Sequence, residues 1–399
     1  MENGMRSMTA TGYRRVSKRR PCGICGKPDW CSTTATETIS FCARSTLNAD
    51  RVSRYGWGVY YHEGYRLAFD FDFERNFKRF PSRIMIRVLR ALAPPAIRDK
   101  VYRKLIELSP ASSSDEIVNG RGGLSERGIQ DYSQYGSLPR LANERNVLVE
   151  RLIEELAKEG NGKQLSFAGI PGFWRDARGT LRLWSEQDSF DDLMLIPFVG
   201  SDGLIRAYQI RFMRYLPNKS GRYVWLSSSN QRSGCGPGAP LHHADPHPGL
   251  DKPVLVTEGA LKAATAQRFL PDRYVVGNSG VATSHREIIE TARRRALEIA
   301  FDNDSFTNSH VARAMASLIR LRYEDQRSFV YDDEVRVLTW GRSLKGIDEA
   351  LLAGLQLKRL TVAEWLKCLS PECQEQASGQ LSFAERGKEA AGRKYDVSV

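Results

Sequence analysis

The sequence predicts a multidomain protein of mixed α/β class, with a zinc module near its N-terminus and a parallel-sheet domain further along. Four of the seven cysteines lie between Cys22 and Cys42, a clustering typical of a metal site and not of a disulfide scaffold. Between residues 252 and 355, β-prone and helix-prone segments alternate, which is the pattern of βαβ units. The length of 399 residues suits two or three domains.

Charge and composition narrow the class of protein. A hydrophobic content of 41% excludes wholesale disorder. The 59 Lys and Arg residues outnumber 47 Asp and Glu residues, a net charge of +12, which favours a polyanionic partner. Half of this excess lies in residues 1–54, with ten cations against four acids. No apolar run is long enough to span a membrane and the N-terminus has no secretory signal, so we expect a cytoplasmic protein.

Shifts in composition divide the chain into six segments. Pro94 and Pro95 break a helical pattern over residues 83–129, and a Gly- and Pro-rich segment precedes residue 251. The predicted segments are a flexible basic arm (1–20), the zinc module (21–65), a helical linker (66–140), a subdomain with antiparallel strands (141–250), the parallel-sheet domain (251–355), and a short helical segment with a disordered tail (356–399).

The first candidate site has the spacing C-x2-C-x5-C-x10-C, from Cys22, Cys25, Cys31 and Cys42. Four thiolates around one ion form the usual closed structural zinc site, although His62 is an alternative to Cys31 or Cys42. Cations surround this motif together with Trp30 and two other aromatic residues, Tyr55 and Trp57. Such rings either stack on nucleic-acid bases or form the small core of the module.

Basic and aromatic side chains also follow the predicted strands 204–212 and 222–228. Alternation along a strand places Arg206 and Tyr208 on one face and Arg211 on the other. The candidate nucleic-acid or nucleotide contacts in these strands are Arg206, Arg211, Arg214, Tyr223 and Trp225. The alternative is an exposed sheet face with buried aromatic residues.

Acidic residues follow two predicted strands of the parallel-sheet domain. Glu258 lies at the end of the predicted strand segment 253–259, and Asp302 and Asp304 lie at the end of the segment 297–304. Ligands bind at the carboxyl ends of parallel strands, and carboxylates gathered there suit Mg²⁺ or Mn²⁺. Such ions support phosphoryl transfer. A single acid after a strand is more often a helix cap. A glutamate after one strand together with an Asp-x-Asp pair after a later strand is much less common as a set of caps.

These motifs resemble those of a known family. Glu-Gly after one strand and Asp-x-Asp after a later one are similar to the toprim domain, a Rossmann-like fold, of bacterial DnaG-type primases. Further segments resemble primase-like replication proteins of plasmids, phages and integrative elements: CGICGKPDWC, GLSERGI, GIPGFW, LVTEGALKA and KGIDEALLAG.

The resemblance implies roles for individual residues. Glu258 corresponds to the toprim glutamate, and Asp302 and Asp304 to the metal-binding pair. Lys345 and the accessory acid Asp348 resemble a Lys-Asp-Pro-Asp-type segment, although the proline is absent and the spacing differs. Lys262 is either a phosphate contact or an exposed lysine. The cysteine motif lacks the histidine and the second C-x2-C that are usual in primases.

The resemblance also implies an activity, primer synthesis on a single-stranded DNA template from nucleoside triphosphates. A toprim nuclease and a non-catalytic single-stranded DNA or origin-binding protein are the alternatives. The sequence contains no GxxxxGK[ST] phosphate loop, the motif of a nucleotide-driven motor. We therefore expect a replicative helicase, where one takes part, to be a separate partner.

Overall fold

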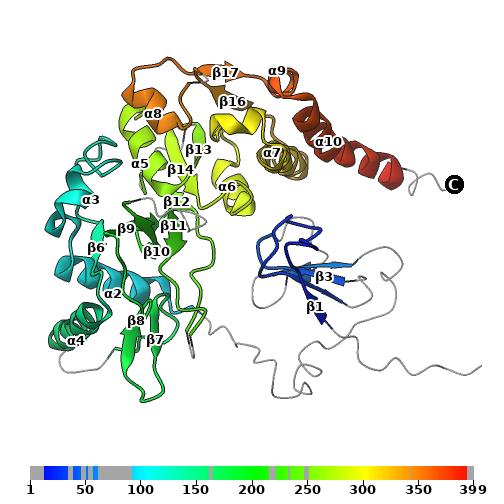
Figure 1. Ribbon diagram of the computed structural model, residues 1–399. Helices are drawn as coiled ribbons and strands as arrows, with labels where there is room; N and C mark the ends of the chain where they lie inside the picture. The colour runs from blue at the N-terminus through cyan, green and yellow to red at the C-terminus, as the bar shows by residue number, and fades with distance from the viewer. Residues whose placement is uncertain are drawn as a thin grey trace, which may run out of the picture. The chain divides into compact units, whose positions relative to one another are not determined.

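The computed structural model describes residues 13–34, 39–45, 51–52, 57–61, 92–160, 165–214, 222–231, 234–246, 251–341 and 343–392. The chain divides into two compact units, Met1–Ile86 and Arg87–Val399 (Figure 1). None of the helices within the described ranges is long and apolar enough to cross a membrane.

The first unit contains a five-stranded antiparallel sheet in the order β1-β2-β3-β5-β4. Its strands are β1 (Tyr13–Arg15), β2 (Ser32–Thr34), β3 (Ile39–Cys42), β4 (Arg51–Val52) and β5 (Gly58–Tyr61). The expected flexible arm is wrong for its described part, because β1 pairs with β2. The Val16 amide also donates to the Cys31 carbonyl at 3.2 Å, which ties this segment to the cysteine cluster.

The second unit begins with a four-stranded antiparallel sheet in the order β11-β10-β9-β6, which confirms the expected antiparallel strands. Its strands are β6 (Gly136–Leu138), β9 (Leu193–Val199), β10 (Ile205–Phe212) and β11 (Tyr223–Trp225). A separate hairpin joins β7 (Phe173–Arg175) to β8 (Leu181–Leu183).

Helices cover one face of this antiparallel sheet. Helix α2 (Pro95–Leu108) and helix α4 (Ala142–Glu159) share a hydrophobic core with alternate residues of β9 and β10. Helix α2 lies in the segment predicted as a linker, yet its residues Tyr102 and Leu105 are fully buried in this core. The turn η2 (Ala111–Ser113) and α3 (Asp115–Asn119), capped by Ser114, follow α2.

The other face of the antiparallel sheet packs against the neighbouring domain. Met194, Ile196 and Phe198 alternate along β9 with the residues under α2 and α4, and they contact Ala260 and Leu261. These last two residues open α5 (Ala260–Phe269). The helix that directly follows Glu258 is therefore seated on the antiparallel sheet.

The third sheet has six strands in the order β12-β14-β13-β15-β16-β17. The four central strands are parallel, as the alternating pattern predicted: β13 (Val254–Glu258), β14 (Tyr274–Asn278), β15 (Leu297–Ala300) and β16 (Val335–Thr339). The antiparallel edge strands are β12 (His242–His243) and β17 (Lys358–Leu360).

Helices cover both faces of this sheet (Figure 1). Helices α6 (His285–Ala292) and α7 (Ser309–Phe329) share one core with Val256 and Val276. On the other face, α5 and α8 (Ile347–Leu352) share a core with Leu255 and Val275. The 3-10 turn η3 (Asn303–Phe306) joins β15 to α7.

The C-terminal segment differs from the expected disordered tail. After α9 (Val362–Cys368), α10 runs over Pro371–Gly392. Its first half packs against α7, because Cys373 and Ala377 are fully buried and Leu381 adjoins the same core. The spacing of four residues between these side chains forms an apolar stripe on one helix face.

Candidate functional site

Four parallel strands end at one edge of the six-stranded sheet, and each supplies residues to the candidate site. Glu258 ends β13, Asn278 ends β14, Asp302 and Asp304 follow β15, and Lys345 lies in the loop after β16. Parallel strands place their carboxyl ends together, and α/β proteins bind ligands at this edge. The structure thus brings together the three acids that the sequence singled out.

Lysine ammonium groups neutralise two of these acids. Lys262, in the first turn of α5, forms an ion pair with Asp302. Lys345 Nζ lies 3.6 Å from Asp302 Oδ2 and 3.3 Å from Asp304 Oδ2. The side chain of Lys262 is 21% exposed and that of Lys345 is 65% exposed, so Lys262 is not a freely exposed lysine.

Burial and charge together shift the acid–base properties of the site. Burial raises the pKa of Glu258 above its usual value; nearby Lys262 opposes this shift, while Asp302 and Asp304 add to it. Burial opposes the charge on Lys345, but Asp304 and Asp302 raise its pKa overall. Shifted ionisation of this kind is typical of functional sites.

The donors at this edge fit a hard divalent cation, although they are not drawn into one tight cluster. Among the described residues, the four cysteines are the only group of three or more Cys, His, Asp or Glu side chains whose ligand atoms all lie within 4.8 Å of one another. Mg²⁺ needs only one or two protein carboxylates, because waters and substrate phosphates complete its shell. Asp302 is 4% exposed, so its carboxylate is held in place before an ion arrives.

Asp348 lies close to this edge, but its carboxylate forms an ion pair with an arginine from another segment. Arg127 Nη1 forms an ion pair with Asp348 Oδ2 at 2.7 Å, and Asp348 is 3% exposed. Gly346 precedes it, and a Cβ atom at Gly346 would lie 2.3 Å from Asp348 Oδ1. The pair therefore connects α8 to the segment after α3.

Arg211 joins the same network from the antiparallel sheet. Both Arg211 and Arg127 donate a hydrogen bond to the Gly122 carbonyl oxygen. Arg211 is 1% exposed, and burial lowers its pKa, an effect that Tyr223 opposes. Arg211 was expected to contact nucleic acid, but the structure places it inside the protein, where it supports the turn that carries Gly122.

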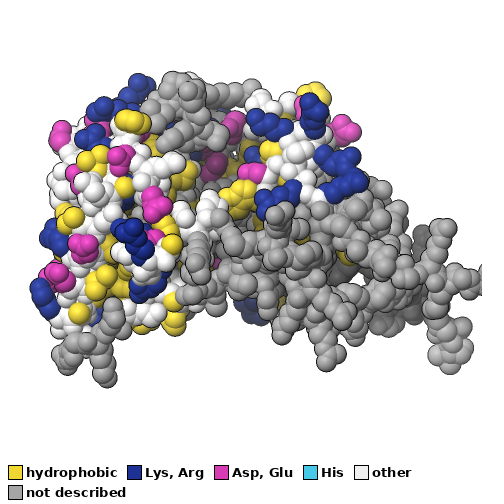
Figure 2. All heavy atoms as spheres, turned by 60° about the horizontal axis from the view of Figure 1, so that its bottom comes forward, with side chains coloured by type: hydrophobic (Ala, Val, Ile, Leu, Met, Phe, Trp, Pro, Cys, Tyr) yellow, Lys and Arg dark blue, Asp and Glu magenta, His cyan; other side chains and the backbone are white. Residues whose placement is uncertain are grey.

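The other predicted nucleic-acid contacts are spread around the antiparallel sheet. Arg206 pairs with Asp202 at 2.7 Å, and Arg214 is exposed. Tyr223 is 44% exposed on the edge strand β11, while the half-buried Trp225 lies 4.7 Å from Phe198 between ring centroids. On the face shown in Figure 2, Lys and Arg side chains lie in several separate groups with acidic side chains interspersed. Arg206 lies near the start of β10 and Arg214 lies beyond its end, so these two cations do not share a site.

The cysteine motif forms a cluster in the first unit. Cys22, Cys25, Cys31 and Cys42 are all buried and free of disulfides. The Sγ atoms of Cys25 and Cys31 are 3.6 Å apart, and those of Cys31 and Cys42 are 3.7 Å apart. Tetrahedral Zn–S bonds of ~2.3 Å require S···S separations of about 3.8 Å. The cluster therefore fits structural zinc, whereas His62 lies outside the described residues.

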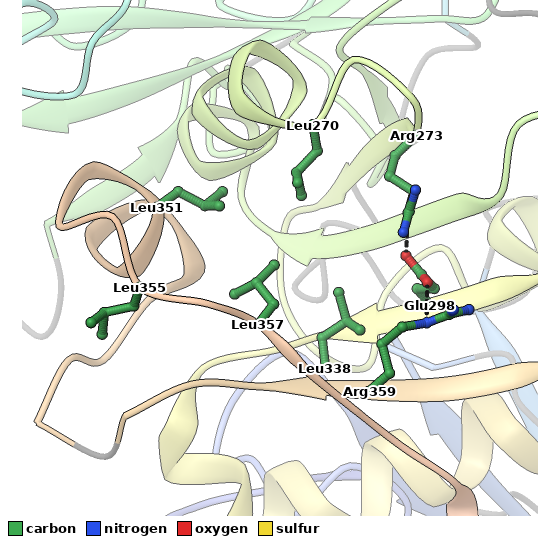
Figure 3. A pocket seen from close by; sticks show the side chains of 8 residues that line it. All are labelled: Leu270, Arg273, Glu298, Leu338, Leu351, Leu355, Leu357 and Arg359. Atoms are coloured by element: carbon green, nitrogen blue, oxygen red, sulfur yellow. Dashed lines mark hydrogen bonds and ion pairs between the residues drawn. The ribbon is translucent and has the colours of Figure 1, made fainter.

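A cavity of about 210 Å³ lies away from the acidic edge, on the face of the sheet covered by α5 and α8. Figure 3 shows Glu298 between Arg273 and Arg359 at one side of this cavity. Glu298 is 1% exposed and pairs with Arg273 Nε at 2.6 Å and with Arg359 Nε at 2.9 Å. The rest of the lining consists of leucine side chains: Leu270, Leu338, Leu351, Leu355 and Leu357.

Two residues of the acidic edge were not anticipated from the sequence. Arg127 and Asp348 form an ion pair although they are 221 positions apart in the sequence. A local sequence pattern cannot predict a pair at this separation. Asn278 ends β14 beside Glu258. Its place at the carboxyl end of a parallel strand, like that of Glu258, is a signal that could have identified it.

Comparison with known proteins finds similar structures but no matching sequence family or curated protein. The sequence matches no family model and no curated protein. The fold is similar to the Aquifex aeolicus primase, with its zinc-binding and RNA polymerase domains, at 15% identity over 77% of this chain and 74% of that chain, with a TM-score of 0.44.

Two further solved structures are similar. The RNA polymerase domain of Mycobacterium tuberculosis primase DnaG, in complex with a double-stranded DNA oligomer that has a 6-nucleotide overhang, is 14% identical over 73% of this chain and 98% of that chain, with a TM-score of 0.41. The E. coli primase catalytic core is 13% identical over 76% of this chain and 98% of that chain, with a TM-score of 0.39.

Proposed function

We propose that this protein is a primase-like, toprim-type nucleotidyltransferase that synthesises short primers on single-stranded DNA. The observation that carries the proposal is the convergence of Glu258, Asp302 and Asp304, with Lys262 and Lys345, at the carboxyl edge of a parallel sheet. Acids and lysine ammonium groups at one edge suit the handling of a triphosphate. The motifs that resemble replication proteins of plasmids, phages and integrative elements favour a role in copying such an element.

In this proposal, Glu258, Asp302 and Asp304 hold Mg²⁺ or Mn²⁺. The ion supplies charge neutralisation at the α-phosphate and activation of the attacking 3′-hydroxyl. Asp302 is buried and fixed by Lys262, so it keeps its position during nucleotide entry. Lys345 has an exposed side chain, and it exchanges its contact with Asp304 for the incoming phosphates. Zinc in the first unit is structural, and that unit helps to hold the template.

The test is primer synthesis on single-stranded DNA with nucleoside triphosphates and Mg²⁺ or Mn²⁺. Wild-type protein should make short primers, and the double variant Asp302→Ala, Asp304→Ala should make none. The matched control is Asp272→Asn, at an acid whose side chain is 69% exposed before β14; it should prime like wild type. Full priming by the double variant would refute the proposal. Degradation of DNA without nucleotides would identify a nuclease, and DNA binding without synthesis a non-catalytic protein.

A further inference from the structure

Asn278 is a buried amide whose side chain has no hydrogen-bond partner. The residue is 0% exposed, and neither Nδ2 nor Oδ1 is hydrogen-bonded to any described residue. A buried polar group left unpaired is destabilising, so such groups are rare in native proteins and each one calls for a physical explanation. The position of Asn278 in the sheet provides one.

The strand register places Asn278 directly beside Glu258. In the parallel pair of β13 and β14, Glu258 is opposite Asn278. Val256 and Val276, two positions earlier in each strand, both belong to the core under α6 and α7. Because side chains alternate along a strand, Glu258 and Asn278 project on that same face, from backbones about 4.8 Å apart.

The backbone fixes this arrangement tightly. The Gly259 amide donates to the Asn278 carbonyl oxygen at 2.7 Å. Gly259 has a φ of +90°, and a Cβ atom at Gly277 would lie 2.7 Å from the Gly259 carbonyl oxygen. Glycine at both positions lets the turn after Glu258 rest against the end of β14, which holds the carboxylate and the amide next to each other.

We propose that Asn278 is a positioning residue of the divalent-metal site: its Nδ2 donates a hydrogen bond to the Glu258 carboxylate and orients it for ion binding. The two residues are opposite each other on adjacent strands, about 4.8 Å apart at the backbone, a separation that side chains of this length can bridge. The amide is kept, despite its burial cost, because it acts when the ion is bound. The inference rests on the proposed function, since it requires an ion at Glu258.

The test compares Mn²⁺ affinity with stability in zinc-loaded, full-length protein. Free Mn²⁺ is measured by electron paramagnetic resonance, and the Tm is measured without Mn²⁺. Asn278→Leu, similar in size but apolar, should weaken Mn²⁺ binding by about 10–100-fold, the usual effect of losing a group that orients a metal ligand. Its Tm should be equal to or above that of wild type, because the unpaired amide is gone. A merely structural residue would not combine these two effects.

Thr257→Val is the matched control. Thr257 is also 0% exposed with an unpaired buried Oγ1, and it adjoins Glu258 but projects toward the opposite face of the sheet. This variant should keep wild-type Mn²⁺ affinity. Asn278→Asp should also bind Mn²⁺ more weakly, because an aspartate cannot donate to Glu258; tighter binding would mean direct contact with the ion and would overturn the proposal.

The outcomes separate the two proposals. Equal Mn²⁺ affinity of wild type and Asn278→Leu would overturn the role of Asn278 and leave the proposed function standing, with the amide satisfied by water only. Wild-type protein that primes DNA but binds Mn²⁺ independently of Glu258, as judged with Glu258→Gln, would also overturn it. Wild-type protein that binds no Mn²⁺ and makes no primer would overturn both.

Discussion

Trp30 is an exposed aromatic residue held in an unusual backbone conformation. Its φ is +69°, a region that bulky residues rarely adopt, and the residue is 61% exposed immediately before Cys31. Arg44 forms a two-pronged pair with Asp29, at 2.6 and 3.0 Å, and its Cζ lies 5.5 Å from the centre of the Trp30 ring. Strain at an exposed ring favours a binding role over a place in the core.

We expect Trp30→Ala to weaken binding of single-stranded DNA by about tenfold, because one base–aromatic stack contributes ~1–3 kcal/mol. The measurement is a fluorescence-anisotropy titration of labelled oligothymidine at fixed salt. Exposed cations on the same unit, among them Arg14, Arg15 and Lys27, should preserve the phosphate contribution. The variant should therefore retain the salt dependence of wild type.

An abasic oligonucleotide and a second aromatic variant provide the controls. Wild type should lose affinity for the abasic strand, and Trp30→Ala should bind both strands alike. Phe190→Ala removes a ring that is 88% exposed in the second unit and should leave binding unchanged. Wild-type affinity of Trp30→Ala, with zinc content retained, would contradict a stacking role.

At the residue scale, the sequence predicted which side chains lie at the ends of strands. It did not predict which other side chains or carbonyl groups they contact. The positions of Glu258, Asp302 and Asp304 came from the rule that ligands gather at carboxyl ends of parallel strands. The alternation rule separated Arg211 from Arg206, but it could not show that Arg211 faces the Gly122 turn. That contact depends on how two segments 89 positions apart pack, which no local pattern encodes.

At the scale of elements, the zinc module has a small core and short strands. Its core is formed by the four cysteines and Tyr60, with Val16, Ile24 and Ala43 packed around them. Its strands contain two to four residues each, too few to bury a sizeable core without a staple. A zinc ion held by the four cysteines would therefore supply much of the folding free energy of the unit.

Removal of zinc should unfold the first unit and leave the second unit folded. We expect one zinc per chain by elemental analysis. After treatment with a chelator, hydrogen exchange in β2, β3 and β5 should become fast, while β9, β10 and β13 stay protected. Cys42→Ser should reproduce the effect, because Cys42 is fully buried in the cluster. Cys368→Ser, at an exposed cysteine in the second unit, should change nothing. Equal protection with and without zinc would contradict a structural role.

Element prediction succeeded where the hydrophobic pattern was long and regular. Alternating strands and helices predicted β13 to β16 in their observed parallel arrangement. The edge strands β12 and β17 have two and three residues, too short to give a period. Helix α10 was not predicted because the residues of its packing stripe, Cys373, Ala377 and Leu381, are set in a mostly polar segment.

At the scale of the whole molecule, two sheets of the second unit meet at a buried histidine. The Val199 amide, at the end of β9, donates to Nδ1 of His242 in β12 at 3.2 Å. Burial, with a smaller contribution from His243, lowers the pKa of His242 to about 3. The imidazole is therefore neutral at pH 7, as a ring nitrogen that accepts a hydrogen bond must be.

Three buried histidines make the stability of this unit sensitive to acid. Burial also lowers the pKa of His243 to about 4, where Arg206 adds to the effect, and that of His285 to about 4, where the Val281 carbonyl opposes it. In the unfolded chain each histidine takes up a proton near pH 6.5. Between pH 6.5 and about 4 the unfolded state thus binds more protons, so the free energy of unfolding must fall as the pH falls.

We therefore expect each of these histidines to contribute a slope of about 1.4 kcal/mol per pH unit in that window. His242→Asn keeps an acceptor for the Val199 amide but cannot be protonated, so its free energy of unfolding in urea should fall less steeply with acid than that of wild type. Zinc loss at low pH affects both proteins equally and cancels in the comparison. Parallel pH profiles for His242→Asn and wild type would mean that His242 is already charged in the folded protein, and the contact between β9 and β12 would then need another explanation.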